Sequence, residues 1–231
     1  MNVNKDFLPR INHPLYFIRI ALYRGIKEQA NQLKGILLDF GCGQKPYKSL
    51  FNVDKYIGID YDNPGHDHKN EEIDVIYDGK NIPFDNEYFD SVLCSEVFEH
   101  LFDIEHTLQE IHRVLKKGGK LLITCPFVWN EHEIPHDYAR YTVFALEHLF
   151  AKYKFNVISI KKGGNFIKTI TQLRVLYFLC HISPYFSKIP GGKYLNRLII
   201  SLLNTWGIFK SFLLPRRYDI YLSNIFLVER I

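Results

Sequence analysis

Short apolar runs alternate with helix-like stretches over residues 36–160, and no other feature of the sequence constrains the fold as strongly. Each run is four to six residues long and nearly continuous, which is typical of strands buried on both faces of a parallel sheet. This rhythm predicts an α/β fold with a doubly wound sheet. The predicted strands are residues 35–40, 56–60, 74–77, 89–94, 120–125 and 155–160.

Helical patterns divide the chain into four regions. Residues 103–117 place apolar side chains on one face, and residues 142–153 begin at Thr142, a typical helix N-cap. An amphipathic helix is expected at residues 15–33, before the first strand. The regions are a helical lead-in (1–34), a sheet-forming core (35–164), a helical insertion (165–217) and a closing strand (218–231).

Basic residues are concentrated in the insertion. The chain holds 29 Lys and Arg against 25 Asp and Glu, and a net charge of +4 is too mild to indicate a nucleic-acid-binding protein. Residues 165–218 contain eight basic residues and no acidic one, so the remainder holds 21 basic and 25 acidic residues. Apolar residues of the insertion follow helical spacing. They are Leu195, Leu198, Ile199, Leu202, Leu203, Trp206, Phe209 and Leu213, with Lys193, Arg197, Ser201 and Asn204 on the opposite face.

The cysteines and the apolar runs indicate a reduced, cytoplasmic protein. Four cysteines lie far apart, with neither a CxxC pair nor a dense disulfide pattern. The N-terminal residues, with an early Asp6, lack the apolar region of a signal peptide. The longest uncharged runs of the insertion hold 13 and 12 residues (175–187 and 198–209), whereas crossing a bilayer takes about 20. We therefore expect no transmembrane helix.

Glycines and acidic residues follow four successive predicted strands. Gly41 and Gly43 come after the first strand, where the lack of a side chain lets the backbone approach a ligand. Asp60 ends the second strand, in a position to accept hydrogen bonds from ribose hydroxyls. Each feature alone is common in ordinary turns, but their order predicts a ligand site at the carboxyl edge of the sheet. The third strand ends at Asp78 and Gly79, and the fourth at Ser95 and Glu96.

A nicotinamide cofactor is disfavoured by the same loop. A dinucleotide-binding loop reads GxGxxG, and Pro46 stands where the third glycine would be. An NAD-dependent oxidoreductase is therefore a lesser alternative.

Four ordered motifs occur between residues 35 and 160. They are LLDFGCG (37–43), Asp78 followed by Ile82-Pro83-Phe84 and Phe89-Asp90, EVFEH (96–100), and EIHRVLKKGG (110–119). Together they resemble the motifs of class I S-adenosylmethionine-dependent methyltransferases, in particular the type 11 small-molecule branch. The resemblance implies a Rossmann-like, seven-stranded sheet of the methyltransferase type, here with a helical insertion before the last strand, and S-adenosylmethionine as the cofactor.

The resemblance also implies a role for each residue at the carboxyl edge. Asp39, Gly41 and Gly43 would contact the methionine part of the cofactor, and Asp60 its ribose. Asp78 with Gly79 would border the adenine. The full set of predicted cofactor-binding residues is Asp39, Gly41, Gly43, Asp60, Tyr61, Asp78, Gly79 and Ser95.

The loop after the fifth strand, residues 126–141, is dense in histidines, carboxylates and aromatic residues. In this fold such a loop overhangs the cofactor's methyl group. O-methylation requires an in-line approach of a hydroxyl oxygen and removal of its proton. His132 and His136 are candidate bases because imidazole titrates near pH ~6.5, and Glu96 is a third candidate. Alternatively, the histidines only hydrogen-bond the loop to the sheet.

A metal site is a further possibility at the EVFEH motif. In small-RNA 2′-O-methyltransferases and some quinone O-methyltransferases, a similar ExxEH motif supplies ligands to a divalent metal that acidifies the acceptor hydroxyl. The metal is not favoured, because the motif also occurs in metal-free relatives, where Glu99 and His100 hold helix and sheet together. The ligands, if a metal binds, would be Glu96, Glu99, His100 and His136.

Three roles remain open for the insertion. In the first, its helices cap the sheet or form a homodimer interface. In the second, it contacts an anionic membrane from the cytoplasmic side, and in the third it covers a lipid-linked or phosphorylated acceptor. We expect an enzyme that O-methylates a small-molecule, glycan or lipid-linked sugar hydroxyl. RNA 2′-O-methylation is disfavoured because the chain outside the insertion is net acidic, and a catalytically silent cofactor-binding partner is the alternative from another class.

Overall fold

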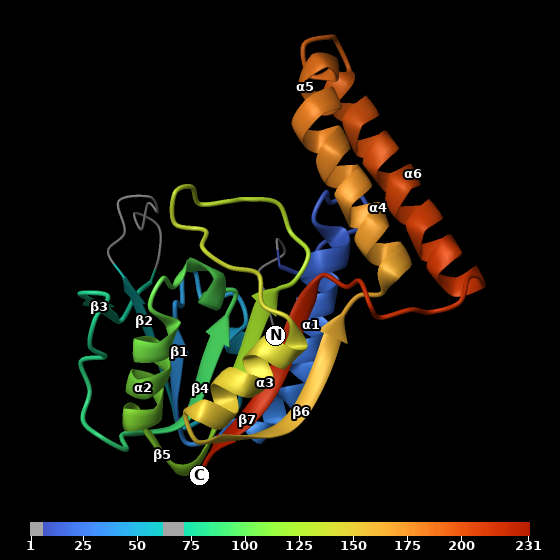
Figure 1. Cartoon of the computed structure of the whole chain (residues 1–231). Coiled ribbons are helices and arrows are strands. Elements are labelled where there is room, and N and C mark those ends of the chain that lie inside the picture. The colour runs from blue at the N-terminus through green and yellow to red at the C-terminus, as the bar shows by residue number, and fades with distance from the viewer. Residues whose placement is uncertain (1–6, 62–71) are drawn as a thin grey trace.

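The computed structural model describes residues 7–61 and 72–231 and contains a seven-stranded sheet (Figure 1). The strand order is β3-β2-β1-β4-β5-β7-β6. β7 runs antiparallel to β5 and β6, and the other neighbouring pairs are parallel. The predicted α/β class and seven-stranded sheet are confirmed. The strands are β1 Ile36–Phe40, β2 Lys55–Tyr61, β3 Val75–Tyr77, β4 Phe89–Ser95, β5 Leu115–Pro126, β6 Phe155–Gly163 and β7 Ser223–Arg230.

Helices cover both faces of the sheet (Figure 1). α1 (Tyr16–Gln29) packs on one face, and α2 (Ile104–Val114) and α3 (Val143–Lys152) pack on the other. Neighbouring residues of β1 show the two faces, because Leu37 packs with α1 and Leu38 with α2 and α3. Short 3-10 turns are Ala30–Gln32, Lys48–Leu50 and Phe98–His100. The helix predicted at residues 15–33 corresponds to α1, and residues 1–6 of the lead-in region, Asp6 included, lie outside the described part of the chain.

Two elements differ in length from the sequence pattern. α2 stops at Val114 and not at residue 117, because Leu115 is extended (φ −81°, ψ 134°) and pairs with Phe89 of β4. The last strand begins at Ser223 and not at residue 218, because the Leu222 carbonyl accepts hydrogen bonds from the loop after β5 instead of continuing the ladder. Thr142 caps α3 as predicted, its hydroxyl accepting from the Ala145 amide at 3.2 Å.

The insertion is a helical hairpin between β6 and β7. It comprises α4 (Phe166–Tyr177), a π-helical turn (Phe178–Ile182), α5 (Ser183–Phe186) and α6 (Gly192–Leu213). Figure 1 shows it rising beyond the sheet on the same side as the loop after β5, with α5 at its far end. The boundaries of the four regions stay a prediction. None of the helices among the described residues is long and apolar enough to cross a membrane.

α6 turns its polar side inward, which the sequence pattern does not indicate. Asn204, expected opposite the apolar face, is fully buried, and its side-chain amide donates to the carbonyls of Ile11 (2.7 Å) and His13 (3.1 Å). Leu198 and Leu202 of the predicted apolar face are 55% and 61% exposed. Hydrogen bonds to the body of the molecule therefore set the rotation of this helix. Of the predicted apolar face, Ile199 and Leu203 pack toward α4, and the other six residues are exposed.

Candidate functional site

A cleft of about 510 Å³ opens at the carboxyl ends of β1, β2, β3 and β4. Ligands of open α/β sheets bind at this edge. Six of the eight predicted cofactor-binding residues line the cleft, together with two of the three candidate catalytic residues. They are Gly41, Gly43, Asp60, Tyr61, Asp78 and Gly79, with Glu96 and His136.

The glycine loop leaves room that a side chain would fill. Gly41 has φ of 71°, and a Cβ there would lie 2.4 Å from Cγ2 of Val97. Only glycine adopts this conformation without strain and without that clash. Asp60 holds the loop, since its Oδ2 accepts a hydrogen bond from the Gly43 amide at 2.8 Å. Asp60 thus shapes the loop and also lines the cleft.

The turn after β3 forms the opposite wall. Gly79 has φ of 75°, and a Cβ there would lie 2.7 Å from the ring of Tyr61. The Asp78 carboxylate accepts from the amides of Lys80 (2.8 Å) and Asn81 (3.2 Å), and these hydrogen bonds lower its pKa. The turn therefore presents a flat, open surface beside the Tyr61 ring.

Two predicted cofactor-binding residues do not line the cleft. Asp39 is buried, its carboxyl accepts from the Tyr56 hydroxyl at 2.5 Å, and burial raises its pKa to about 7. The Ser95 hydroxyl is hydrogen-bonded to that of Thr124 at 3.0 Å. Both side chains are therefore hydrogen-bonded within the protein instead of facing the cleft.

Glu96 is held in an unusual position at the end of β4. Its backbone is left-handed (φ 55°), and its carboxyl is buried at the inner end of the cleft. The Ser223 hydroxyl donates to Oε2 at 3.4 Å, while Oε1 has no hydrogen-bond partner among the described residues. Burial raises the pKa of the Glu96 carboxyl above its usual range. A carboxyl in this state can accept a proton near neutral pH.

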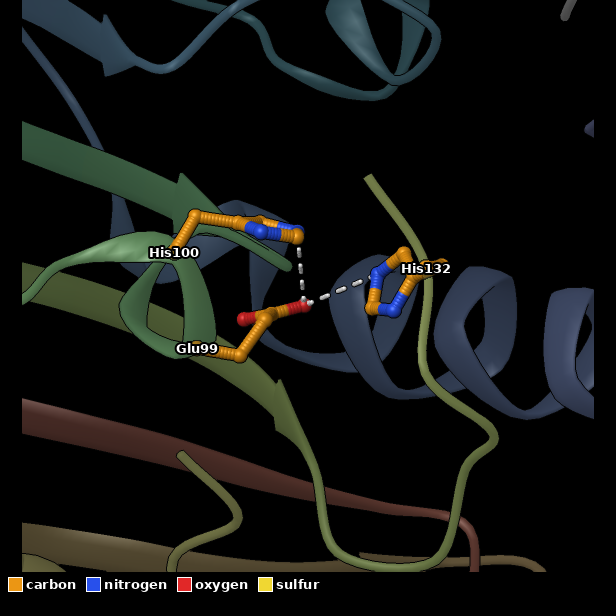
Figure 2. A group of neighbouring side chains, drawn as sticks. All are labelled: Glu99, His100 and His132. Carbon is orange, nitrogen blue, oxygen red and sulfur yellow. Dashed lines mark ion pairs between the residues drawn. The ribbon is translucent and has the colours of Figure 1, made fainter. Parts of the chain in front are cut away.

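Glu99, His100 and His132 form a second cluster, shown in Figure 2. Glu99 is fully buried, and its Oε1 lies 3.8 Å from His100 Nε2 and 4.0 Å from His132 Nε2. Neither oxygen of Glu99 has a hydrogen-bond partner in the described parts of the chain. Burial and the neighbouring Glu96 raise the pKa of the Glu99 carboxyl well above its usual range. The group therefore either carries a proton or needs a cation beside it.

His100 is oriented so that its Nε2 faces this cluster. Its Nδ1 lies 2.7 Å from the carbonyl oxygen of His136, an acceptor only, so Nδ1 carries the proton and donates. A neutral His100 then has its lone pair on Nε2, 3.8 Å from Glu99 and from Glu133. Metal-ligating histidines are commonly oriented by this kind of hydrogen bond.

His132 is fixed by an ion pair behind the cluster. Asp137 Oδ2 accepts a hydrogen bond from the His132 backbone amide at 3.0 Å and lies 3.3 Å from Nδ1 of the His132 ring. Arg140 binds both oxygens of Asp137, at 2.6 and 2.7 Å, and keeps the pKa of that carboxyl well below its usual range. Burial, and after it the nearby His100, lower the pKa of His132. The neutral imidazole is the form that binds a metal.

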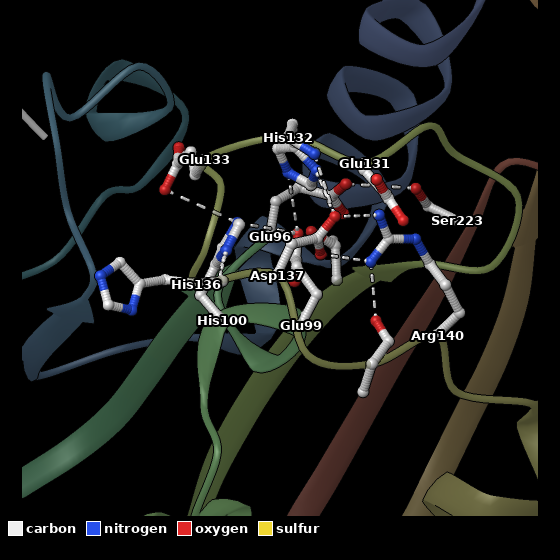
Figure 3. Close-up of polar contacts among 12 residues, drawn as sticks. Glu96, Glu99, His100, Glu131, His132, Glu133, His136, Asp137, Arg140 and Ser223 are labelled. Carbon is white, nitrogen blue, oxygen red and sulfur yellow. Dashed lines mark hydrogen bonds and ion pairs between the residues drawn. The ribbon is translucent and has the colours of Figure 1, made fainter. Parts of the chain in front are cut away.

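His136 lies apart from the cluster that it was expected to join. Figure 3 shows its ring pointing away from Glu99, and its Nδ1 lies 3.0 Å from the Tyr138 hydroxyl. It lines the cleft, whereas His132 does not. The side chains that could hold a metal are thus Glu99, His100 and His132, with neither His136 nor Glu96 among them.

Several lining residues lie outside the four motifs of the sequence. Glu133 and Tyr138 come from the loop after β5, Lys80 from the turn after β3 and His106 from α2. Only the fold brings these separate segments together. The density of polar and aromatic residues in the loop after β5 was the one available indication for Glu133 and Tyr138.

Comparisons with known proteins agree with this geometry. Residues 38–123 match the family model described as a methyltransferase domain. An uncharacterised protein of Methanocaldococcus jannaschii is 33% identical over 114 residues, 47% of this chain and 48% of that protein. A tRNA (carboxymethyluridine(34)-5-O)-methyltransferase of Arabidopsis thaliana is 32% identical over 100 residues, 41% of this chain and 24% of that protein. The chain thus spans about half or less of the length of these relatives.

A solved structure shares the fold and contains the cofactor. Phosphoethanolamine N-methyltransferase 2 of Haemonchus contortus in complex with S-adenosyl-L-methionine has a TM-score of 0.53, with 18% identity, over 97% of this chain and 59% of that one. Residues 38–123 thus match a methyltransferase domain, within a fold shared with a methyltransferase that was solved with S-adenosyl-L-methionine.

The cleft of the methyltransferase domain fits this cofactor. Two positive-φ glycines, Gly41 and Gly79, clear space that any side chain would fill, and Asp60 lines the same cleft. A carboxylate at the end of the second strand suits a ribose diol, and the exposed backbone of the glycine loop suits the amino-acid end of the cofactor. The groups on these walls are therefore compatible with this cofactor.

Proposed function

We propose that the protein transfers the methyl group of S-adenosylmethionine to a hydroxyl of a small-molecule or glycan-type acceptor, a lipid-linked sugar included. One observation carries the proposal: Gly41, Gly43 and Asp60 share one cleft with Glu96 and His136. The first three suit the cofactor, and the last two can accept a proton. A cofactor-side wall and a proton-accepting wall around one cavity are what O-methylation requires.

The chain's own residues supply binding and proton removal. Gly41, Gly43 and Asp60 would hold S-adenosylmethionine, which would supply an electrophilic methyl group on its sulfonium and leave as S-adenosylhomocysteine. The proton that the hydroxyl loses goes to His136 Nε2 or to the Glu96 carboxylate. His136 is suited to this role because its Nδ1 is engaged with Tyr138, which leaves Nε2 toward the cleft.

A metal-assisted route is the second candidate. It is supported by Glu99, whose two buried oxygens lack hydrogen-bond partners beside the ring nitrogens of His100 and His132. One carboxylate and two imidazoles suit a borderline divalent cation such as Zn²⁺, which lowers the pKa of a bound hydroxyl. His132, and not the His136 suggested by the resemblance to metal-dependent enzymes, is the second histidine of this candidate metal site. RNA remains the less suited acceptor, because the chain outside the insertion is net acidic.

The test measures transfer of a radioactive methyl group from the cofactor to an acceptor. Purified protein is incubated with S-adenosylmethionine tritiated in the methyl group and with an extract of glycans and lipid-linked saccharides, with and without a chelator. We expect label in the saccharide fraction that survives alkaline hydrolysis, as a methyl ether does and a methyl ester does not. His136→Ala or Glu96→Gln should lower the rate by about 10²–10⁴-fold while S-adenosylhomocysteine still binds.

Three outcomes would contradict parts of the proposal. Label that is sensitive to ribonuclease would identify RNA as the acceptor. Loss of transfer with the chelator, restored by Zn²⁺, would favour the metal route. Tight binding of S-adenosylhomocysteine without turnover on any fraction would identify a cofactor-binding partner protein instead of an enzyme.

A further inference from the structure

Helix α6 presents an uncharged apolar stripe that faces away from α4. Its side chains recur every three or four residues, so they lie on one side of the helix. They are between 37% and 66% exposed, and over a 22-residue helix the stripe runs about 30 Å. The stripe consists of Leu195, Leu198, Leu202, Trp206, Phe209 and Leu213.

The hairpin does not use this stripe for its own folding. Apart from Ile200, the buried residues of α6 are polar or small, and its two buried asparagines donate hydrogen bonds through their side-chain amides. Asn196 donates to the Ser183 carbonyl at 3.1 Å, and Asn204 donates to the chain before α1. At Gly207 the backbone of α6 approaches Thr171 of α4 so closely that a Cβ would lie 2.4 Å from its methyl group. The apolar stripe is therefore surplus to the internal packing.

Exposed apolar residues are gathered on the hairpin out of proportion to its size. Residues 165–218 hold 16 of the 26 large apolar side chains that are exposed in the described chain. Patches of this extent mark surfaces for a partner or a membrane. Beyond the stripe they include Tyr177, Tyr185 and Ile189 near the far end and Phe212 and Leu214 near the base.

Positive charge borders one side of the stripe. At 3.6 residues per turn, Lys210 lies along its edge, whereas Arg197 lies on the opposite face of the helix. The Lys210 ammonium lies 5.0 Å from the Trp206 ring centroid, and Trp206 stacks on Phe209. Residues 165–218 contain no Asp or Glu. The surface thus combines apolar side chains, an indole ring and one cationic border, without a carboxylate.

We propose that α6 docks lengthwise on an anionic membrane surface. The stripe enters the boundary between headgroups and acyl chains, and Lys210 beside it meets lipid phosphates, while the other basic residues of the hairpin attract it to the anionic surface. A second copy of this chain is the competing occupant. Pairing stripe to stripe would place Lys210 of each copy at an interface to which the hairpin contributes no acidic residue, which disfavours it. Docking stands independently of the proposed methyl transfer.

The first test measures vesicle binding of the full chain. Vesicles of equal parts phosphatidylglycerol and phosphatidylcholine are compared with phosphatidylcholine alone in co-sedimentation, at low and high salt. We expect binding to the anionic vesicles that weakens with salt. The Trp129→Phe background leaves Trp206 as the only tryptophan, since the chain has two. Its emission should shift to the blue when the anionic vesicles are added.

Variants separate the two parts of the surface. Leu198→Ser with Leu202→Ser should weaken binding at least tenfold, because two apolar side chains no longer enter the bilayer. Lys210→Gln should weaken it about fivefold and reduce the salt dependence, and Arg197→Gln, on the opposite face of α6, should weaken it less. Phe144→Ser is the matched control, since Phe144 is 79% exposed on α3 and lies outside the hairpin. It should bind vesicles like the wild type.

Two results would overturn the proposal. One is a wild-type chain that stays in the supernatant with anionic vesicles and whose Trp206 emission does not move. The other is a dimer in light scattering that the Leu198→Ser, Leu202→Ser variant makes monomeric, which would assign the stripe to a second copy. S-adenosylhomocysteine binding of each variant shows that the methyltransferase domain is folded, so failure of docking is distinguishable from failure of the proposed activity.

Discussion

Asp60 connects the glycine loop to the ligand edge of the cleft. Its Oδ2 accepts from the Gly43 amide, and the same carboxylate lines the cavity. Asp60→Ala removes both the loop contact and the acceptor for ribose hydroxyls. Because hydrogen bonds to a charged group contribute about 1.5–3 kcal/mol, we expect S-adenosylhomocysteine to bind 10- to 100-fold more weakly in calorimetry.

Two companion variants make this measurement specific. Asp60→Asn retains one acceptor for the Gly43 amide and should lose less affinity than Asp60→Ala. Asp54→Ala changes an exposed carboxylate that precedes the same strand and should bind normally. Wild-type affinity in Asp60→Ala would remove Asp60 from the ligand-binding set.

Asp39 makes stability depend on pH. Burial raises its folded-state pKa from 3.8 to about 7. Between these values the folded chain holds a proton that the unfolded chain has lost, so this group makes the folded state less stable as pH rises from about 4 to 7. Asp39→Asn keeps an acceptor for Tyr56 without titrating. Its unfolding free energy relative to the wild type should rise across that window, by up to roughly 4 kcal/mol.

Urea unfolding at a series of pH values measures this difference. Asp85→Asn, which changes an exposed carboxylate, should track the wild type throughout. A constant offset between Asp39→Asn and the wild type from pH 4 to pH 7 would show that Asp39 is ionised in the folded protein.

The site residues that follow strands were predictable, and those in the long loop were only partly so. Gly41, Asp60 and Gly79 are positioned by strand ends, which the apolar runs locate in the sequence. His132 and His136 lie in a loop without periodicity, so spacing cannot tell which ring turns inward. The Asp137–Arg140 ion pair decides it by binding the His132 backbone, and a single sequence does not reveal that pairing.

At the scale of elements, periodicity located the helices but not the side that α6 buries. An apolar face normally packs inward, because burying it stabilises the fold. Here Gln172 of α4 accepts from the Phe17 and Ile18 amides at the start of α1, and Asn204 binds the residues just before it. These hydrogen bonds are long-range, so they leave no local pattern, and they determine how the hairpin is rotated.

Gly207 is where the two long helices approach each other most closely. Gly207→Ala places a Cβ about 2.4 Å from the Thr171 methyl group, so the helices must move apart. Overpacking of this kind costs about 1–3 kcal/mol. We expect faster hydrogen exchange in α4 and α6, with unchanged exchange in β1 and β4 and unchanged S-adenosylhomocysteine affinity.

Two variants test whether the clash with Thr171 causes the faster hydrogen exchange. Thr171→Ala in the Gly207→Ala background removes the nearest clashing atom and should restore part of the protection. Thr205→Ala, on the exposed side of α6, should exchange like the wild type. Faster exchange throughout the sheet would mean that hairpin and sheet unfold as one unit.

At the scale of the whole molecule, the charge segregation follows the architecture. The eight basic residues without a carboxylate lie on the hairpin or directly after it, while the net acidic remainder builds the sheet, the covering helices and the cleft. The net charge of each segment could be counted from the sequence. The direction in which the hairpin projects was not, because it depends on the contacts between α1, α4 and the chain before α1.

The ends of the hairpin lie together, which allows it to be removed. The Phe166 amide donates to the Arg217 carbonyl at 2.9 Å, and Gly163 pairs with Ser223. Replacing residues 166–217 with a short Gly-Ser linker therefore leaves β6 and β7 as an antiparallel pair joined by a loop of ordinary length.

The loss of Gln172 exposes the first amides of α1, so the melting temperature should fall by several degrees. The cleft contains no hairpin residue, so S-adenosylhomocysteine should bind within about threefold of the wild-type affinity, whereas vesicle binding should be lost. A shortened chain that folds but no longer binds S-adenosylhomocysteine would show instead that the hairpin shapes the cofactor site.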